Sequence, residues 1–251
     1  MSRQLYTMLA IAGSDPMGGA GIQADIQTGL SLGVHVLTAI TAVTAQNSKG
    51  MKQLGVVSPC LLENQLTSIL EDVVPNSIKI GMIGSSENLK VIDKFLKKIP
   101  QEVPIVIDPL IKTTAGNDNL SEDNLKDLYK TFLFHRVTVV TPNLMEMDFV
   151  PADVAKIIKG GHGHEESVYD KLIDKDGKIT IHKHQRISCS NTHGSGCCYS
   201  SLLACYLAFG LSLRDAFLKT STKVNEIISR SCEYSLGNSS YGPLNINNYI
   251  L

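Results

Sequence analysis

The sequence lacks the features that would place it outside the ordinary globular class. No apolar run is long enough to cross a bilayer, and the 251 residues contain no low-complexity tract or internal repeat. Lysine and arginine (23) balance aspartate and glutamate (24), and no basic run stands out, so an electrostatic case for nucleic-acid binding is missing. The chain is long enough for one large core or at most two small domains, and no stretch has the composition of a linker.

Signals for export and for structural metal are also missing. The short N-terminal apolar run ends in the turn-forming residues 13–16 (GSDP), which predicts a first strand rather than a signal peptide. The six cysteines show neither C-x-x-C nor paired cysteine–histidine spacing, so we expect reduced thiols in a cytoplasmic protein and no structural zinc. Cys60, Cys198 and Cys205 are predicted to be small core residues.

What is present is an alternation of two kinds of apolar segment. Runs rich in β-branched residues predict strands at 5–13, 34–46, 77–83, 103–111, 137–143 and 155–161. Helical periodicity and capping signals predict helices at 22–33, 58–73, 85–99 and 121–133, then a buried helix after Cys198 and another within 211–235. Because the strands are continuously apolar, they predict an α/β fold with a mostly parallel sheet covered by helices on both faces.

One connection is short for this topology. A parallel pair needs a crossover of roughly a dozen residues or more, usually a helix. Only residues 142–154 lie between the strand that ends near Thr141 and the next candidate strand. Either this crossover is unusually short, or a segment that was disordered in a crystal is missing from the sequence between about 147 and 158; we favour the second interpretation.

Polar residues recur where the predicted strands end. In a doubly wound sheet, ligands bind beyond the carboxyl ends of the strands. The residues at these exits are Gly13, Ser14, Asp15, Gln46, Asn47, Gly81, Met82, Asp108, Asn143, Glu146 and Lys159. Each alone is compatible with a simple turn, but their concurrence at one sheet edge predicts a single ligand cleft.

Two glycine-rich segments are candidates for an anion site. Residues 13–21 (GSDPMGGAG) lack the Gly-Lys-Ser/Thr ending of a P-loop and the G-x-G-x-x-G spacing of dinucleotide sites. Residues 193–197 (HGSGC) precede a helix, and Gly194 and Gly196 allow backbone N–H groups to turn toward a ligand at its positive end. We therefore expect a phosphate at the second segment.

Cys197 lies at the same helix start, where the pKa of a thiol is expected to be lowered. This allows a cysteine hydrolase, but His193 is the only partner evident in the sequence. A bridge between Cys197 and Cys198 would be strained. Two further interpretations remain for Cys197: its thiol lies beside an anion-binding loop, or it only fills space in the core.

Several segments together resemble one family. "AIAGSDPMGGAGIQADIQT", "TAVTAQNSKG", "IKIGMIGS", "VIDPL", "TPNLMEM", "KGGH" and "NTHGSGCCYSS" are similar, in order and over nearly the whole chain, to the hydroxymethylpyrimidine/phosphomethylpyrimidine kinases of thiamine biosynthesis, in the ribokinase-like superfamily. The resemblance implies a three-layer α/β/α sandwich, a single kinase domain over 1–251, a homodimer, and ATP with Mg2+. It also implies two successive phosphorylations, of the pyrimidine alcohol and then of its monophosphate.

The same resemblance implies roles for residues of the substrate pocket. Gln46 would pair with the aminopyrimidine edge, where its carboxamide offers both a donor and an acceptor. Gly13, Asp25 and Met82 would line the pyrimidine pocket. Loop histidines near the site, His162, His164 and His193, are expected to be solvent-exposed rather than phosphate ligands.

The resemblance also implies the residues that act on phosphate. Asn143 and Glu146 match an N-x-x-E pattern that holds magnesium through water, with Asp108 nearby, and Lys159 would neutralise ATP phosphates. Gly194, Gly196 and the Cys197 amide would form an anion hole, with the Cys197 thiolate as general base. Ser195 and Cys198 replace threonines usual in the family, and a helix-sized stretch after "TPNLMEM" is absent.

Three alternatives remain open at this stage. A pyridoxal kinase of the same superfamily fits most of these residues, although pyridoxal lacks the aminopyrimidine edge that Gln46 would pair with. A non-catalytic pyrimidine sensor would not need Lys159, Glu146 and Cys197 together. A cysteine hydrolase would form an acyl-enzyme on Cys197 and would not require ATP.

Overall fold

A single sheet runs through the computed structural model, which describes residues 5–110, 122–143, 146–162, 166–234, 236 and 242–248. The nine strands lie in the order β3-β2-β1-β4-β5-β6-β7-β8-β9. They are β1 (Thr7–Ser14), β2 (His35–Asn47), β3 (Gly50–Val56), β4 (Ser77–Ile80), β5 (Ile105–Ile107), β6 (Val139–Val140), β7 (Lys156–Ile158), β8 (Ser167–Ile173) and β9 (Ile179–Gln185). In this order the neighbouring strands from β2 through β1, β4, β5 and β6 to β7 pair in parallel. The pairs β2–β3, β7–β8 and β8–β9 are antiparallel.

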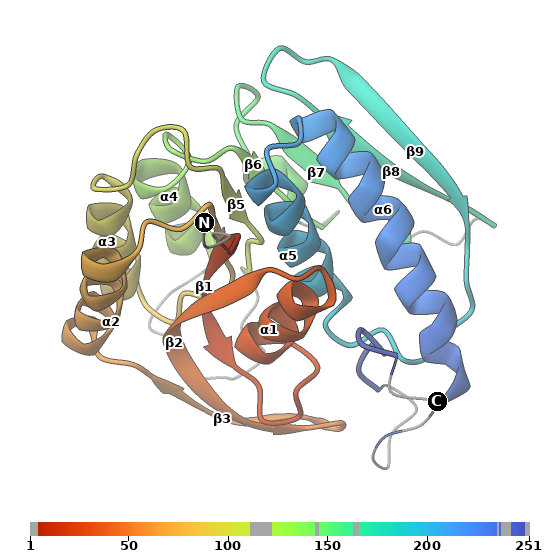
Figure 1. Cartoon of the computed structure of the whole chain (residues 1–251), viewed down its shortest axis with the longest axis horizontal. Coiled ribbons are helices and arrows are strands. Elements are labelled where there is room, and N and C mark those ends of the chain that lie inside the picture. Colours follow the sequence, from red (N-terminus) through yellow and green to blue (C-terminus); the bar gives the residue numbers. More distant parts are fainter. Residues whose placement is uncertain are drawn as a thin grey trace.

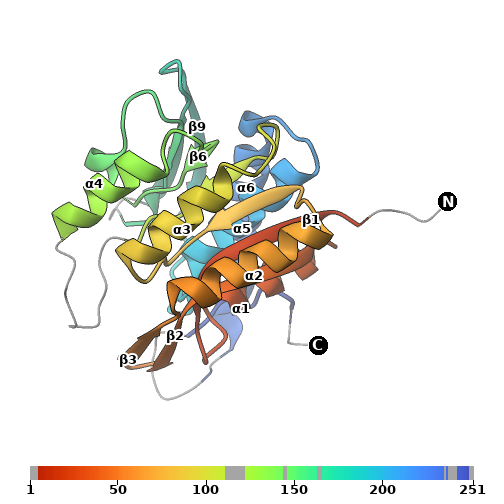
Figure 2. The ribbon, with the colours of Figure 1, turned by 90° about the vertical axis from the view of Figure 1, so that its left-hand side faces the viewer.

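Helices cover both faces of this sheet. They are α1 (Gly21–Ser31), α2 (Pro59–Asp72), α3 (Ser86–Leu96), α4 (Glu122–Phe132), α5 (Ser195–Ala208) and α6 (Leu213–Arg230), with short 3-10 turns at Met147–Phe149, Gly160–His162 and Ser231–Glu233. Figure 1 shows α2, α3 and α4 on one side of the sheet and α1, α5 and α6 on the other, and Figure 2 gives the view from the α2–α3 side. The predicted three-layer α/β/α fold is confirmed.

Residues of β1 alternate between two cores, because successive side chains of a strand point to opposite faces. Met8 and Ala10 pack in the core with α1, α5 and α6, whereas Leu9 and Ile11 pack in the core with α2, α3 and α4. All four side chains are fully buried. This two-sided burial explains why the central strands have no polar alternation.

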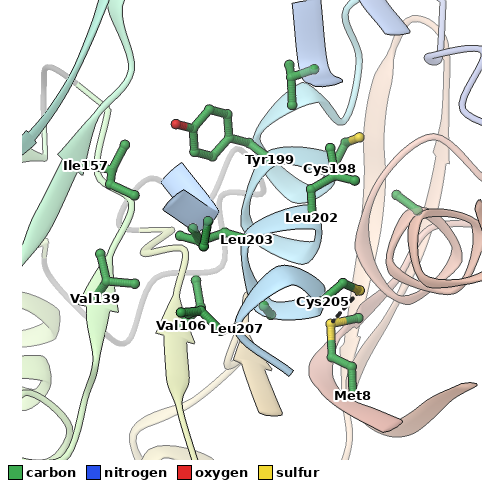
Figure 3. Close-up of a cluster of buried hydrophobic side chains, with 14 of the residues drawn as sticks. Met8, Val106, Val139, Ile157, Cys198, Tyr199, Leu202, Leu203, Cys205 and Leu207 are labelled. Carbon is green, nitrogen blue, oxygen red and sulfur yellow. Dashed lines mark hydrogen bonds between the residues drawn. The ribbon is translucent and has the colours of Figure 1, made fainter. Parts of the chain in front are cut away.

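Ten of the 14 residues of the apolar helix α5 are buried. Its side chains pack on the sheet beside Met8, Val106, Val139 and Ile157, and a weak contact of 3.8 Å joins the Cys205 and Met8 sulfur atoms (Figure 3). Because most side chains of α5 are packed in the core, the helix is held firmly in place. Its N-terminus lies at the carboxyl ends of the strands. Among the described helices, none is long and apolar enough to span a membrane.

Two helix starts follow the sequence signals. Ser58 caps α2, and its hydroxyl accepts the Leu61 N–H at 3.3 Å just before Pro59. Ser212 caps α6 by accepting the Asp215 N–H at 3.1 Å. Such caps satisfy backbone donors that have no partner inside the helix.

The structure differs from the sequence expectations at several positions. The hairpin partners β3, β8 and β9 were not predicted. All six cysteines are free, and Cys198 and Cys205 are buried as predicted, but Cys60 lies exposed near the start of α2, so its predicted core role is wrong. Proline at the first helical position sets where α2 begins, and Cys60 falls on its solvent side.

The short crossover closes without an α-helix in its described residues. Between β6 and β7, which pair in parallel, the chain forms the 3-10 turn Met147–Phe149, and Phe149 packs in the core. In the described part of this connection, residues 141–143 and 146–155, the 3-10 turn is the one helical element. That a further segment is missing between about 147 and 158 stays a prediction.

Candidate active site

A pocket of about 510 Å3 opens at the carboxyl ends of the strands. It is bounded by the ends of β1, β2, β5 and β7 and by the N-terminus of α5, and it extends toward β8, β9 and α6. Of the eleven residues to which the resemblance assigns site roles, ten line it: Gly13, Gln46, Met82, Asp108, Asn143, Glu146, Lys159, Gly194, Gly196 and Cys197. The eleventh, Asp25, does not.

Glycines bring the two glycine-rich segments together. Gly194, the N-cap of α5, has φ +80°, and a Cβ there would lie 1.6 Å from the Gly19 carbonyl oxygen. Gly21 has φ +56°, and its Cβ would lie 2.2 Å from the Gly13 carbonyl oxygen. Because no side chain fits at either place, the starts of α1 and α5 can meet at one wall of the pocket.

The N-terminus of α5 faces the charged centre of the pocket. A Cβ on Gly196 would lie 3.4 Å from Asp108 Oδ2 and 3.5 Å from Lys159 Nζ. The first turn of a helix offers unpaired N–H groups and a positive field. The predicted anion site and the lysine expected to neutralise phosphate are therefore neighbours.

Burial changes the expected chemistry of Cys197. Its pKa is raised, because burial and the Asp25 and Asp108 carboxylates outweigh the opposing effects of the Lys79 ammonium and the Gly21 N–H. The predicted lowering of this pKa is therefore wrong for the ligand-free pocket. The expectation for helix N-termini considers only the partial charges of the first turn. Here the cost of removing the thiolate from water is larger than the stabilisation that the helix N-terminus gives it.

Asp25 lies behind the pocket wall rather than in it. Its side chain is fully buried and binds the equally buried Lys79 at 2.8 and 2.9 Å, and Ser201 donates to it at 2.7 Å. Lys79, in turn, lines the pocket. A single lysine within the apolar strand 77–80 was the sequence signal for this residue, since a buried ammonium requires an anionic partner.

Asp15 organises the loop after β1. Its carboxylate accepts the N–H groups of Gly19 and Ala20 at 3.2 and 2.8 Å and lies 3.1 Å from His193 Nε2. Burial would raise the pKa of Asp15, but hydrogen bonds from His193, Gln46 and the backbone lower it to about 2. His193 is thus a half-buried partner of Asp15 and not the exposed loop histidine that we expected. The side chain of His162 and the whole of His164 lie outside the described residues.

Gln46 lies near the end of β2 and lines the pocket. Beside it the β2–β3 register shifts, because β3 has one extra residue, Lys52, between the partners of Ala45 and Gln46. Gly13 and Met82 are in close contact across the floor, since a Cβ on Gly13 would lie 3.0 Å from Met82 Sδ. This end of the pocket combines an apolar thioether with a carboxamide, which suits a flat heteroaromatic ring with polar edges.

The opposite side of the pocket carries two carboxylates and a lysine. Asp108 Oδ1 lies 3.0 Å from Lys159 Nζ and accepts the Thr141 hydroxyl at 3.0 Å. Asn143 and Glu146 cap one another, with the Asn143 N–H donating to Glu146 Oε2 at 3.0 Å and the Glu146 N–H donating to Asn143 Oδ1 at 3.1 Å. The N-x-x-E spacing therefore also stabilises the loop after β6.

Comparisons with known proteins identify the family of this chain. The family model described as phosphomethylpyrimidine kinase matches residues 15–156 and 150–245, two segments that overlap within the short crossover. A hydroxymethylpyrimidine/phosphomethylpyrimidine kinase of Staphylococcus aureus (strain MRSA252) is 32% identical over 259 residues, covering 94% of this chain and 92% of the relative. A probable thiamine biosynthetic bifunctional enzyme of Oryza sativa subsp. japonica is 35% identical over 260 residues, which cover 94% of this chain but only 46% of that enzyme.

Solved structures share the fold. The pyridoxal kinase of Staphylococcus aureus in complex with AMP-PCP and pyridoxal has a TM-score of 0.84 at 25% identity, covering 98% of this chain and 95% of that one. A phosphomethylpyrimidine kinase of Clostridium difficile has a TM-score of 0.71 at 28% identity, covering 88% of this chain and 98% of that one. With the family model matched over most of its length, the chain belongs to the phosphomethylpyrimidine kinase family.

Proposed function

We propose that this chain uses ATP to phosphorylate 4-amino-5-hydroxymethyl-2-methylpyrimidine and then its monophosphate. The observation that carries the proposal is the meeting in one pocket of an acceptor end (Gln46, Met82), a charged centre (Lys159, Asp108) and the N-terminus of α5. Phosphoryl transfer needs chiefly positioning and charge neutralisation, and these groups supply both.

The pyrimidine would lie at the Gln46 end. The carboxamide can donate to a ring nitrogen and accept from the exocyclic amine, while Met82 contacts the ring face. Asp25 has no contact with substrate in this account. Its role is to hold Lys79, which lines the pocket beside Cys197.

The transferred phosphate would bind at the start of α5. The backbone N–H groups around Gly194 and Gly196 and the helix dipole favour an anion there. Lys159, next to Gly196, would neutralise charge on the ATP phosphates. The ATP donor carries phosphate charge in both steps, and the acceptor of the second step is a monophosphate, so the same groups also serve the second phosphorylation.

Asp108 and Glu146 suit a magnesium ion, which prefers carboxylate and water oxygens. Both carboxylates line the pocket, and both are oriented by hydrogen bonds, from the Thr141 hydroxyl and the Asn143 N–H. When bound, Mg2+ supplies charge neutralisation to the ATP phosphates. We propose Asp108 and Glu146, with Asn143 supporting the loop, as the residues that hold it.

Cys197 would take the proton from the substrate hydroxyl. Its position at the start of α5 brings the sulfur beside the proposed phosphate site. Because burial raises its pKa, the base form is a minor species at neutral pH, and the chemical step should speed up as pH rises. An aspartate at position 197 would be ionised at a lower pH than the thiol, so the reaction would not need a raised pH.

A pyridoxal kinase activity is the second candidate, since the S. aureus pyridoxal kinase in complex with pyridoxal and AMP-PCP has the same fold at a TM-score of 0.84. ADP release should separate the two. With Mg-ATP, the chain should turn over the pyrimidine alcohol and its monophosphate at kcat/KM at least tenfold above that of pyridoxal. A higher kcat/KM for pyridoxal would overturn the proposal, and no ADP release with any of the three would favour a binding role.

A homodimer in the cytoplasm is part of the same proposal, and sedimentation would test the dimer.

A further inference from the structure

Three potential metal ligands lie together outside the proposed catalytic groups. Asp170 on β8 is directly opposite His182 on β9, and His184 follows two residues later on the same face of β9. One ligand atom from each of these side chains lies within 4.8 Å of the other two. Asp170 is buried and both histidines are half-buried, facing α6.

Hydrogen bonding fixes the state of His182. Its Nε2 lies 3.2 Å from the hydroxyl of Thr222 on α6, and that hydroxyl donates its single hydrogen to the Leu218 carbonyl at 3.1 Å. With its hydrogen donated to the Leu218 carbonyl, the hydroxyl accepts from His182, and this pairing favours the tautomer with the ring proton on Nε2. The lone pair is then on Nδ1, which is buried and has no hydrogen-bond partner among the described residues.

His184 and Asp170 are oriented in the same manner. His184 Nδ1 lies 3.2 Å from the Gln185 carbonyl oxygen, which can only accept, so Nδ1 carries a proton and Nε2 is left to face Asp170 Oδ2 at 3.7 Å. The other oxygen of Asp170 accepts the Gly160 N–H at 2.9 Å. Each potential ligand thus has its second polar atom held by protein, the arrangement typical of metal ligands.

A proton on His184 Nε2 would relieve only half of this arrangement. It would pair His184 with Asp170, but the buried Nδ1 of His182 would still have no donor among the described residues, which is unfavourable for a buried polar atom. A cation among the three atoms would satisfy all of them. A tetrahedral ion with ligands at about 2.0–2.1 Å separates neighbouring ligand atoms by roughly 3.3 Å, close to the 3.7 Å found between His184 and Asp170.

We propose that Asp170, His182 and His184 bind a divalent transition-metal ion of the Zn2+ type. Two imidazole nitrogens and one carboxylate suit Zn2+ and its neighbours, whereas Mg2+ prefers oxygen ligands alone. Asp170 and His184 also line the pocket, and His182 does not. The open fourth position of the ion is therefore accessible from the pocket, to water or to a bound molecule.

Titration of the full chain, without an affinity tag, with Co2+ as a spectroscopic probe and with Zn2+ by calorimetry tests this site. Wild type should bind one ion per chain, with visible Co2+ bands of a tetrahedral site and without the intense near-ultraviolet absorption of thiolate ligands. His182→Ala and Asp170→Asn should each weaken binding at least tenfold. His35→Ala, which changes an exposed histidine of β2, should bind as wild type does.

Two further measurements keep the result interpretable. Far-ultraviolet circular dichroism and urea midpoints would show that the variants are folded. The variant His182→Gln retains a hydrogen-bond donor for Thr222 but removes the imidazole nitrogen that would bind the ion. Equal affinity in wild type and in both His182 variants would overturn the proposal, as would thiolate absorption or no binding by wild type. None of these outcomes depends on kinase activity, so the site can fail while the proposed function stands.

Discussion

The Lys79 ammonium lies 2.8 and 2.9 Å from the two carboxylate oxygens of Asp25, and neither side chain is exposed to solvent. Burial alone would lower the pKa of Lys79, but the Asp25 carboxylate outweighs it and raises that pKa, so the lysine stays charged. The pair links β4 to α1 beneath the pocket. A charge so deeply buried is tolerated only with its partner in place.

Removal of one partner should therefore destabilise the fold strongly. Lys79→Met and Asp25→Asn should each lower the free energy of unfolding by about 3–5 kcal/mol, because each leaves the other group buried and uncompensated. The double variant should lose much less than the sum. Urea unfolding of all four proteins measures this coupling. The exposed pair Lys94–Glu63, at 2.7 Å, is the control and should show little coupling, because solvent screens its charges. Additive losses at Lys79 and Asp25 would contradict the interpretation.

Asp15 should make stability depend on acid pH. Its pKa is about 2 in the fold against an ordinary 3.8, so it stabilises the fold above pH 4 and loses that contribution as pH falls from about 4 to 2. The shift corresponds to about 2 kcal/mol. In Asp15→Asn this pH-dependent part should vanish, whereas Asp176→Asn, at an exposed turn, should keep it. Unfolding curves between pH 2 and 6 that are parallel for wild type and Asp15→Asn would refute the assignment.

Gln46 should set pyrimidine affinity. Its loss leaves polar edges of the bound ring without partners, at a cost of about 1–3 kcal/mol, or roughly a 5- to 150-fold rise in KM for the pyrimidine alcohol. Steady-state kinetics of Gln46→Ala measure this, with Gln53→Ala on the exposed face of β3 as the matched control. An unchanged KM would remove Gln46 from the substrate site. The same change should affect KM for ATP little.

Glu146 should act through magnesium. Glu146→Gln retains an acceptor for the Asn143 N–H, so the loop after β6 should keep its shape while the site loses a negative charge. We expect a higher Mg2+ concentration for half-maximal rate and lower turnover, with pyrimidine KM little changed. Glu71→Gln on the exposed part of α2 is the control. Wild-type magnesium dependence in Glu146→Gln would show that the role assigned to Glu146 is mistaken.

Much of the fold could be predicted because the central strands are buried on both faces. In β1, burial of Met8 and Leu9 on opposite faces produces a continuous apolar run that is easily recognised. The hairpin β8–β9 could not be recognised in the same way. The buried side chains of β8 include the charged Asp170 between Val168 and Leu172. In β9 the inward positions are polar, as at His182, and the isoleucines are exposed, so neither strand shows a complete apolar face.

Site residues that directly follow the ends of strands could be predicted from the sequence. Site residues whose role depends on a partner far away in the sequence could not. Gln46, Asp108 and Lys159 stand at exits visible in the sequence, and all three line the pocket. The partner of Lys79, by contrast, is 54 residues away in the chain. Cys197 illustrates the same limit, because its sequence position indicates a helix N-terminus but gives no measure of its burial.

Single-turnover phosphoryl transfer to the pyrimidine alcohol, across pH, tests the central claim most directly. Wild type should transfer faster as pH rises, since burial raises the pKa of Cys197 and the base form must be generated. Cys197→Ala should be about 10²–10⁴-fold slower with ATP and pyrimidine binding nearly unchanged. Cys198→Ala, a buried neighbour that does not line the pocket, should stay close to wild type, and Cys197→Asp should regain activity with a profile moved to lower pH. If Cys197→Ala instead transfers phosphate at the wild-type rate and with the wild-type pH profile, Cys197 is not the base and the account fails at its centre.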